Sequence, residues 1–201
     1  MRFIGITGGV GAGKTAVLSY LAGQPGIRVM LADEVAHMLM EPQTACFAKL
    51  CEVFRDEDIF SEDGSFDRGK LAVVIFSDER KRAQLNAIVH PAVKEYVIEQ
   101  YRMEQEKKEL SYLFLEAALL IEEHYDAICD ELWYIYTSED NRRVRLKENR
   151  GYTDAKIDGI FASQLKEEEY RSKCRVVIDN NGTQEQTLEQ VKEALRRQAD
   201  E

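Results

Sequence analysis

Gly8-Gly9-Val10-Gly11-Ala12-Gly13-Lys14-Thr15 fits the pattern G-x-x-x-x-G-K-[ST] and follows the apolar run at residues 3–6. This stretch predicts a P-loop, in which successive backbone N–H groups surround the oxygens of a triphosphate. Its four glycines let the backbone curl closely around the anion, and the N-terminus of the following helix directs its positive dipole end there. The alternative is a glycine-rich turn without a ligand, which the eight-residue match and its flanking segments disfavour. We therefore expect the chain to bind a nucleoside triphosphate.

Different residues of this loop are expected to contact different parts of ATP. Lys14 reaches the β- and γ-phosphates, and the hydroxyl of Thr15 is suited to bind Mg²⁺. ATP as co-substrate and Mg²⁺ are therefore the expected cofactors. The residues expected to bind the nucleotide are Gly9, Gly11, Ala12, Gly13, Lys14, Thr15 and Ala16.

Length and composition limit the class of protein. A chain of 201 residues with 44% hydrophobic content suits one α/β domain that carries a modest insertion. The net charge of −10 argues against nucleic acid or an anionic membrane as the principal partner. The four cysteines form no C-x-x-C pair, so metal and disulfide roles are disfavoured. No leader precedes the first strand and no apolar run reaches membrane-spanning length, so we expect a soluble, cytoplasmic protein. The sequence leaves its oligomeric state open.

Predicted strands and helices alternate along the chain. Short apolar runs predict five strands, at residues 3–6, 27–32, 110–116, 131–136 and 176–178. Helices are predicted from residue 14 to about 22, at 34–40 and 117–123, from 139 to about 150, at 154–169, and after the capping pair Thr183 and Gln186. The alternation predicts a three-layer α/β fold of the P-loop NTPase type, with a five-stranded parallel sheet and helices on both faces.

The segment from about 42 to 108 carries no strand signal and predicts a helical insertion. Helical periodicity covers residues 46–54, 68–76, 78–89 and 91–107, and His90-Pro91 is interpreted as a helix boundary. We expect a single P-loop kinase domain over residues 1–201. It would comprise a core (about 1–41, 109–137 and 170–201), an acceptor-binding insertion (about 42–108) and a lid (about 138–169).

Two carboxylates follow predicted strands. Asp33 comes at the C-terminal end of the second strand, where open α/β sheets bind ligands, and it could orient and deprotonate an acceptor hydroxyl. Asp33 is also a good N-cap for the helix at 34–40, and the two roles are compatible. Glu116 ends the third strand and could hold Mg²⁺ through water, although a simple polar group at the end of the sheet is the favoured interpretation.

The helix predicted after the fourth strand is rich in arginine. Arg142 and Arg145 share one face, while Arg143, Lys147 and Arg150 share another. One face could close over the triphosphate and stabilise charge in the transition state. A solvated helix surface is the usual explanation for such a run of charges, but the position, where P-loop kinases carry lids, favours the lid.

These stretches together resemble the dephospho-CoA kinase family over nearly the whole chain. The P-loop has the family form G-x-x-G-x-G-K-[ST], and residues 31–33 resemble its D-A-D motif with Leu31 in place of the first Asp. Residues 67–71 resemble D-R-x-x-L, and residues 85–91 resemble the helix that leads to H-P. Gln164 and the turn at 178–182 also match family positions.

The resemblance implies transfer of the γ-phosphoryl group of ATP to the 3′-hydroxyl of dephospho-CoA, which gives CoA and ADP in the last step of coenzyme A synthesis. It implies that Asp33 activates the hydroxyl and that the insertion holds the acceptor, with Arg68 and His90 as contacts. Dephospho-CoA would thus be the small-molecule partner. Neither nucleic acid nor a membrane is an expected partner.

Two departures from the family pattern affect this expectation. The family's P-L-L-x-E reads here as residues 118–122, with Ala118 in place of Pro and Glu122 retained. The family's R-L-x-x-R would place its second Arg at Asn149, whereas the chain has Arg150 one position later. The candidate lid arginines are therefore Arg142, Arg145 and Arg150.

Two other functions stay open at this point. A P-loop kinase for another small acceptor, such as a nucleoside monophosphate or shikimate, shares the loop, sheet and lid. A nucleotide-dependent switch is a different class. A GTPase would carry the motif [NT]-K-x-D, which the sequence lacks, and the D-x-x-G match at residues 179–182 follows the fifth strand, where a switch would not have it.

Overall fold

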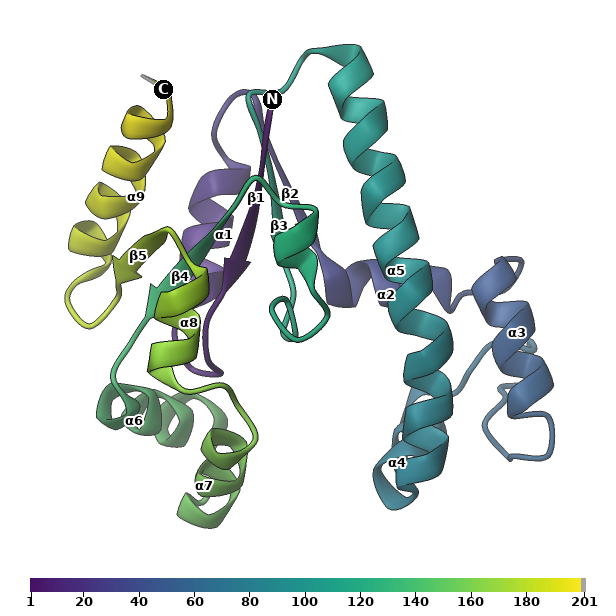
Figure 1. The fold of residues 1–201 in the computed structure, drawn as a ribbon. Coiled ribbons are helices and arrows are strands. Elements are labelled where there is room, and N and C mark those ends of the chain that lie inside the picture. The colour runs from purple at the N-terminus through teal and green to yellow at the C-terminus, as the bar shows by residue number, and fades with distance from the viewer. Residues whose placement is uncertain (200–201) are drawn as a thin grey trace. The chain divides into compact units, whose positions relative to one another are not determined.

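A five-stranded sheet forms the centre of the fold in the computed structural model, which describes residues 1–199 (Figure 1). Its order is β2-β3-β1-β4-β5, and β1 pairs in parallel with β3 and β4, as β4 does with β5. The strands are β1 (Arg2–Thr7), β2 (Ile27–Leu31), β3 (Tyr112–Glu116), β4 (Glu131–Tyr136) and β5 (Val176–Asp179). The predicted five-stranded parallel sheet is confirmed. Residues 200–201, which the predicted core includes, lie outside the described residues.

The chain divides into two compact units, which we describe separately. The sheet unit comprises Met1–Met30 and the chain from Glu104 onward, and the helical unit comprises Leu31–Met103. The sheet unit holds α1 (Lys14–Ala22), α6 (Glu139–Arg150), α7 (Asp154–Ala162), α8 (Glu167–Lys173) and α9 (Gln184–Ala199). The helical unit holds α2 (Ala32–Leu39), α3 (Ala45–Val53), α4 (Arg68–Ser77) and most of α5 (Glu79–Lys107).

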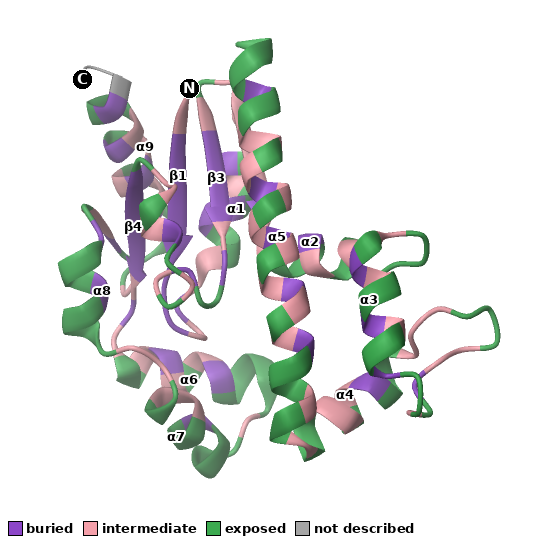
Figure 2. Ribbon diagram, turned by 45° about the vertical axis from the view of Figure 1, so that its right-hand side comes forward, coloured by how far each residue is buried: buried purple, intermediate pink, exposed green. Residues whose placement is uncertain are grey.

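The central strands are buried on both faces, which explains their continuous apolar sequences (Figure 2). In β4, neighbouring side chains point to opposite faces and contact different helices. The carboxylate of Glu131 accepts a hydrogen bond from Gln198 of α9, at 2.6 Å. The ring of Tyr134 stacks on Tyr170 of α8, with centroids 4.7 Å apart. Helices α8 and α9 therefore cover opposite faces of the sheet, as the alternation predicted.

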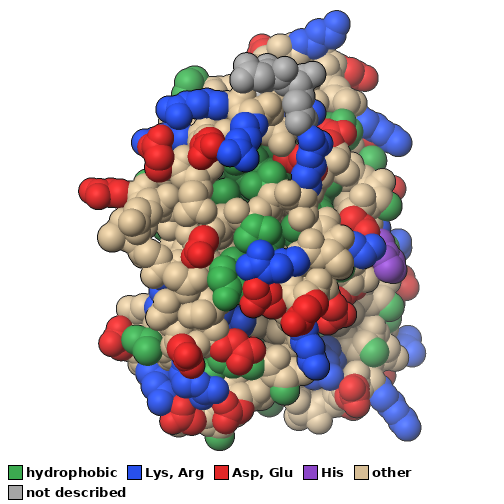
Figure 3. Space-filling model, turned by 60° about the vertical axis from the view of Figure 1, so that its left-hand side comes forward, with side chains coloured by type: hydrophobic (Ala, Val, Ile, Leu, Met, Phe, Trp, Pro, Cys, Tyr) green, Lys and Arg blue, Asp and Glu red, His purple; other side chains and the backbone are tan. Residues whose placement is uncertain are grey.

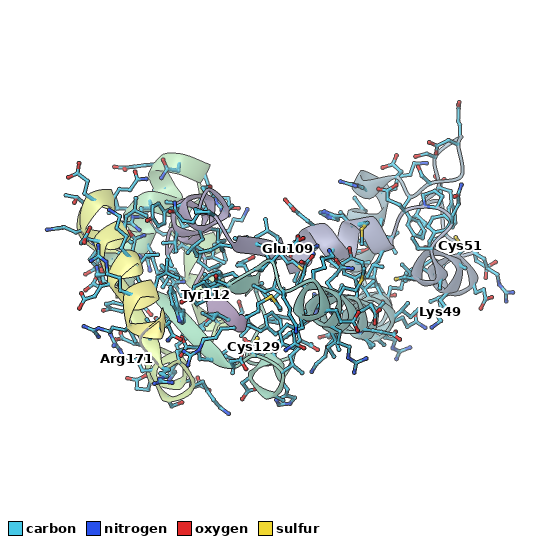
Figure 4. All side chains as sticks on the ribbon, turned by 90° about the horizontal axis from the view of Figure 1, so that it is seen from above. Lys49, Cys51, Glu109, Tyr112, Cys129 and Arg171 are labelled. Carbon is cyan, nitrogen blue, oxygen red and sulfur yellow. The ribbon has the colours of Figure 1, made fainter. Side chains whose placement is uncertain are left out.

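Helices α3 and α4 of the helical unit begin at side chains that cap them. Thr44 accepts a hydrogen bond from the Phe47 amide at 3.0 Å and caps α3, on which Figure 4 labels Lys49 and Cys51. Asp67 accepts from the Lys70 amide at 3.0 Å and caps α4. The helices predicted at 46–54 and 68–76 are thus confirmed to within about one residue.

The predicted boundary at His90-Pro91 is wrong, because α5 runs through it as one helix of 29 residues. Proline lacks the N–H that would bond to the carbonyl four residues earlier, so a local rule favours a break there. The buried residues of α5 nevertheless recur every four positions on both sides of the proline, at Leu85, Val89, Val93 and Val97. This continuous apolar stripe stabilises a single helix.

Two further predictions are corrected in the sheet unit. Residues 118–124 form turns, followed by the short 3₁₀ helix η1 (Tyr125–Ala127), where a helix was predicted at 117–123. Leu120 is fully buried and packs against the backbone of Gly5, so tertiary contact decides this conformation. The helix predicted at 154–169 is two helices, α7 and α8. The Lys166 amide donates to the carboxylate of Glu169 at 3.0 Å, which marks the start of α8.

Charges of both signs are interspersed over the face drawn in Figure 3, without one large patch of a single sign. On α8, the guanidinium of Arg171, labelled in Figure 4, lies 4.8 Å from the ring centroid of Tyr136 and 2.6 Å from the carboxylate of Glu167. Among residues 1–199, none of the helices combines the length and the apolar character needed to cross a membrane.

Candidate active site

The P-loop joins β1 to α1 in a conformation that needs its glycines. Gly11 and Gly13 both have φ of 84°, a value that L side chains rarely adopt. The Ala12 amide donates to the Gly9 carbonyl at 3.0 Å, which closes the turn. Gly13 precedes α1 as its N-cap, and Thr15 and Ala16 are exposed in the first turn. The positive end of the helix dipole at this start suits an anion.

Lys14 and Glu116 form the charged centre of the loop. The ammonium of Lys14 donates to the Gly8 carbonyl at 2.7 Å and lies 3.4 Å from the carboxylate of Glu116. Each of these two side chains is 16% exposed. An ammonium, a carboxylate and the hydroxyl of Thr15 are the groups that a magnesium-bound triphosphate requires. These residues therefore fit ATP with Mg²⁺.

The carbonyl of Ala12 is held by residues from two other loops. Asn180, at the end of β5, donates to it from Nδ2 at 2.7 Å, and the hydroxyl of Thr137 donates to it at 3.0 Å. Asn180 is itself oriented by the hydroxyl of Thr187, which donates to Oδ1 at 2.7 Å. All three of these polar side chains are buried. The network fixes the backbone of the loop just before the helix begins.

Arg142 of α6 contacts the P-loop at Val10. Its Nε donates to the Val10 carbonyl at 2.9 Å, and its Nη2 donates to Oε1 of Gln164. The guanidinium lies 4.4 Å from the ring centroid of Phe161. The residue is only 9% exposed, and this burial lowers the pKa of the guanidinium. A Cβ at Gly9 would overlap the guanidinium, so the glycine allows the close approach of the arginine.

Arg145 lies on the same face of α6, one turn further along. It donates to the Asn180 carbonyl at 2.7 Å and to the hydroxyl of Thr137 at 3.3 Å. The predicted pairing of Arg142 and Arg145 on one face of the helix is thus seen in their contacts with the loop and its supporting residues.

The remaining arginines of α6 lie elsewhere. Arg143 pairs with Asp154 at 3.0 Å and with Asp158 at 2.6 Å, both on α7. Arg150 is exposed at the end of α6, with its guanidinium 6.0 Å from the ring centroid of Tyr152. The structure therefore brings Arg142 and Arg145, but not Arg150, to the P-loop.

The other predicted site residues belong to the helical unit. Asp33 is exposed in the first turn of α2, whose N-cap is Leu31, so its expected capping role is wrong because the helix starts at once after β2. Arg68 lies at the start of α4 and donates to the carboxylate of Glu41 at 3.1 Å. His90 is half-buried in the middle of α5. Arg68 lines a pocket of this unit, and His90 does not line that pocket.

Sequence reasoning missed the roles of Asn180 and Thr137. In the sequence, Asn180 is visible only as part of the turn at 178–182, and no motif singles out Thr137. The neighbouring Ser138 caps α6 by accepting from the Asn141 amide. Asn180 ends one strand and Thr137 follows another. Polar residues at the ends of strands in a parallel sheet were the available signal.

Replacing Gly13 with Ala is expected to lower the free energy of unfolding by about 1–3 kcal/mol. The new Cβ would overlap Nδ2 of Asn180, and φ of 84° is strained for alanine. Urea denaturation measures the loss. Gly159→Ala is the matched control, because nothing lies within 4 Å of the added Cβ in α7. The free energy of unfolding of Gly159→Ala should rise by about 0.5–1 kcal/mol, because alanine is favoured over glycine inside a helix. Equal midpoints for the two variants would contradict the expected strain.

Replacing Arg142 with Lys is expected to lower the free energy of unfolding by about 2 kcal/mol. Lysine keeps the charge but cannot donate to Val10 and Gln164 together from a planar fork. Arg143→Lys changes the neighbouring residue, whose ion pairs are at the surface, and should have a much smaller effect. Thermal and urea unfolding compare the two variants, and an equal loss would remove the special role of Arg142.

Comparison with known proteins places these features in one family. The family model for dephospho-CoA kinase matches residues 2–186. A dephospho-CoA kinase of Shouchella clausii is 37% identical over 198 residues, covering 98% of this chain and 99% of the relative. A crystal structure of TT1252 from Thermus thermophilus has a TM-score of 0.77 at 28% identity, covering 98% of this chain and 97% of that one. A dephospho-CoA kinase from Campylobacter jejuni shares the fold, with a TM-score of 0.70 at 18% identity and 96% of each chain covered.

Proposed function

This chain belongs to the dephospho-CoA kinase family, and from that premise we propose which of its residues transfer the γ-phosphoryl group of ATP to the 3′-hydroxyl of dephospho-CoA. The observation that carries the proposal is the position of Lys14, between the Gly8 carbonyl and the carboxylate of Glu116 at the exposed start of α1. A cation held there meets the β- and γ-phosphates of ATP.

The P-loop binds the triphosphate and Mg²⁺ in this proposal. Backbone amides of the loop, other than the Ala12 amide that closes its turn, donate to phosphate oxygens, and the ammonium of Lys14 stabilises the charge that moves to the β,γ-bridge. Thr15 would hold Mg²⁺ through its hydroxyl, and Glu116 would hold it through water. The metal ion, when bound, neutralises charge on the β- and γ-oxygens.

The arginines of α6 act on the same phosphates. Arg142 and Arg145 already contact the P-loop backbone or the residues that support it, so little reorganisation is needed to place positive charge beside the triphosphate. We assign the lid function to these two residues ahead of Arg150. Asn180 and Thr137 are positioning residues, since both donate hydrogen bonds to the Ala12 carbonyl and so fix the backbone of the loop.

Asp33 accepts the proton of the acceptor hydroxyl. It follows β2 by two residues, and parallel strands of one sheet present their C-terminal ends at the same edge. The carboxylate is exposed, and no described side chain forms a hydrogen bond or ion pair with it. It is therefore available to orient the hydroxyl and to take its proton as the phosphoryl group is transferred.

The insertion at residues 42–108 holds the acceptor, with Arg68 as its cationic contact and His90 as a further contact. In this proposal the chain is one kinase domain with the core, insertion and lid described from the sequence, and it works in the cytoplasm, where its substrates are dissolved.

A coupled assay of ADP release tests the choice of acceptor. With ATP and Mg²⁺ present, ADP should form when dephospho-CoA is added, and not with a nucleoside monophosphate or shikimate. EDTA should abolish the reaction. ADP release that depends on a nucleoside monophosphate but not on dephospho-CoA would contradict the proposal.

A further inference from the structure

The helical unit contains a pocket of about 310 Å³ that the transfer chemistry does not use. It lies among α2, α4, α5 and the segment before α4, and its wall is largely apolar. The apolar lining includes Leu71, Ala72, Ile75 and Leu85. Ligand pockets range from about 300 to 1,000 Å³, so this one suits a part of a large ligand and not the whole.

The polar groups of the pocket lie on one side. His37 and Glu41 come from α2 and its end, and Arg68 comes from the start of α4. Arg68 donates to the carboxylate of Glu41, and the two side chains are 67% and 55% exposed. The pocket therefore has an apolar interior and a charged, solvated rim.

Helix α2 links this rim to the proposed base. Asp33, His37 and Met40 stand at offsets of zero, four and seven, which places them along one face of the helix and its C-cap. Seven residues correspond to about 10 Å along a helix axis. His37 and Met40 line the pocket, so it begins one to two turns from Asp33 within the same unit.

The acceptor has a shape that matches this arrangement. Dephospho-CoA carries its reacting 3′-hydroxyl on the adenosine ribose, and a diphosphate joins the 5′ position to a pantetheine arm. That arm is long, has a gem-dimethyl group and aliphatic segments, and contains only a few amide and hydroxyl groups. A ligand with its ribose at Asp33 and its diphosphate at the rim of the pocket would extend its arm along α2 into the apolar interior.

We propose that this pocket binds the pantetheine arm of the acceptor, with Arg68 at the rim beside the diphosphate, and that the arm selects the substrate. The inference rests on the proposed function, because it takes Asp33 as the group that holds the ribose hydroxyl. It goes further by assigning recognition to apolar contacts at Leu71, Ala72 and Ile75. Nucleotides without the arm would then lack most of the binding energy that distinguishes dephospho-CoA.

Filling the pocket tests the proposal. Ala72→Phe places a ring in the pocket, while Val73→Phe adds the same ring at the next position, where the side chain is 69% exposed. The two halves of the acceptor, 4′-phosphopantetheine and AMP, serve as competitive inhibitors against dephospho-CoA at saturating ATP. In Ala72→Phe, the KM for dephospho-CoA and the Ki of 4′-phosphopantetheine should rise at least about tenfold. The Ki of AMP should stay unchanged, and Val73→Phe should behave as the unmodified chain.

Each result decides the inference. An unchanged Ki of 4′-phosphopantetheine in a folded Ala72→Phe variant that still releases ADP with dephospho-CoA would overturn it and leave the proposed function intact. If the unmodified chain releases no ADP with dephospho-CoA, the proposed function fails and the inference falls with it. If circular dichroism shows Ala72→Phe unfolded, Ile75→Ala decides instead. Removing this side chain should raise the Ki of 4′-phosphopantetheine about tenfold, and an unchanged Ki would overturn the assignment.

Discussion

Asp33→Asn should lower kcat with dephospho-CoA by about 10²–10⁴-fold, the range that positioned acid–base groups contribute. Asparagine has the same size and can still orient the hydroxyl, but it cannot accept the proton. ATP binding depends on the P-loop, so the Kd for ATP should change by less than about twofold. Steady-state kinetics and calorimetric titration with ATP measure the two quantities.

The neighbouring Glu34 supplies a matched control for this variant. It is also an exposed carboxylate in the first turn of α2, and the proposal gives it no role. Glu34→Gln should therefore keep normal turnover. If Asp33→Asn turned over as fast as Glu34→Gln, Asp33 would not be the proton acceptor.

Lys14→Ala should lower kcat/KM for ATP by about 10²–10³-fold, as expected when one charged donor to the transition state is lost. The variant removes the ammonium that contacts Gly8 and Glu116, and it leaves the carboxylate of Glu116 without that partner. The loss should be the same with any acceptor, because it concerns the phosphate end of the reaction. Initial rates at varied ATP measure the effect.

Ser19→Ala is the control on the same helix, since Ser19 is exposed on α1 away from its first turn. It should have normal kinetics. Comparing the unfolding midpoints of Lys14→Ala and Ser19→Ala separates lost chemistry from lost stability. Unchanged kinetics in Lys14→Ala would contradict the assignment of the P-loop itself.

Much of the sheet unit follows from local patterns in the sequence. Strands of a parallel sheet are buried on both faces, so β1, β3 and β4 show as continuous apolar runs. The P-loop and the helix after it are recognised from their sequence motif. The spacing of three residues between Arg142 and Arg145 predicts that they share one face of a helix. These features need no knowledge of distant contacts.

The wrong predictions of secondary structure fall where contacts between residues distant in the sequence determine the conformation. The break predicted at Pro91 follows a local rule, while the buried stripe of α5 is a tertiary feature. Residues 117–123 have a helical composition, yet Leu120 is fixed against Gly5 and the chain forms turns. The turn at Asn180 was visible, but its bond to the Ala12 carbonyl joins residues 168 positions apart. No local pattern encodes such a bond.

The most direct test of the central claim is phosphorus NMR of the products formed from ATP, Mg²⁺ and dephospho-CoA. The account predicts one new phosphomonoester resonance, on the 3′-oxygen of the ribose, in an amount equal to the ADP released. An acceptor analogue that lacks the 3′-hydroxyl should give neither product. ADP released without a 3′-monoester, or no reaction with dephospho-CoA at all, would contradict the account.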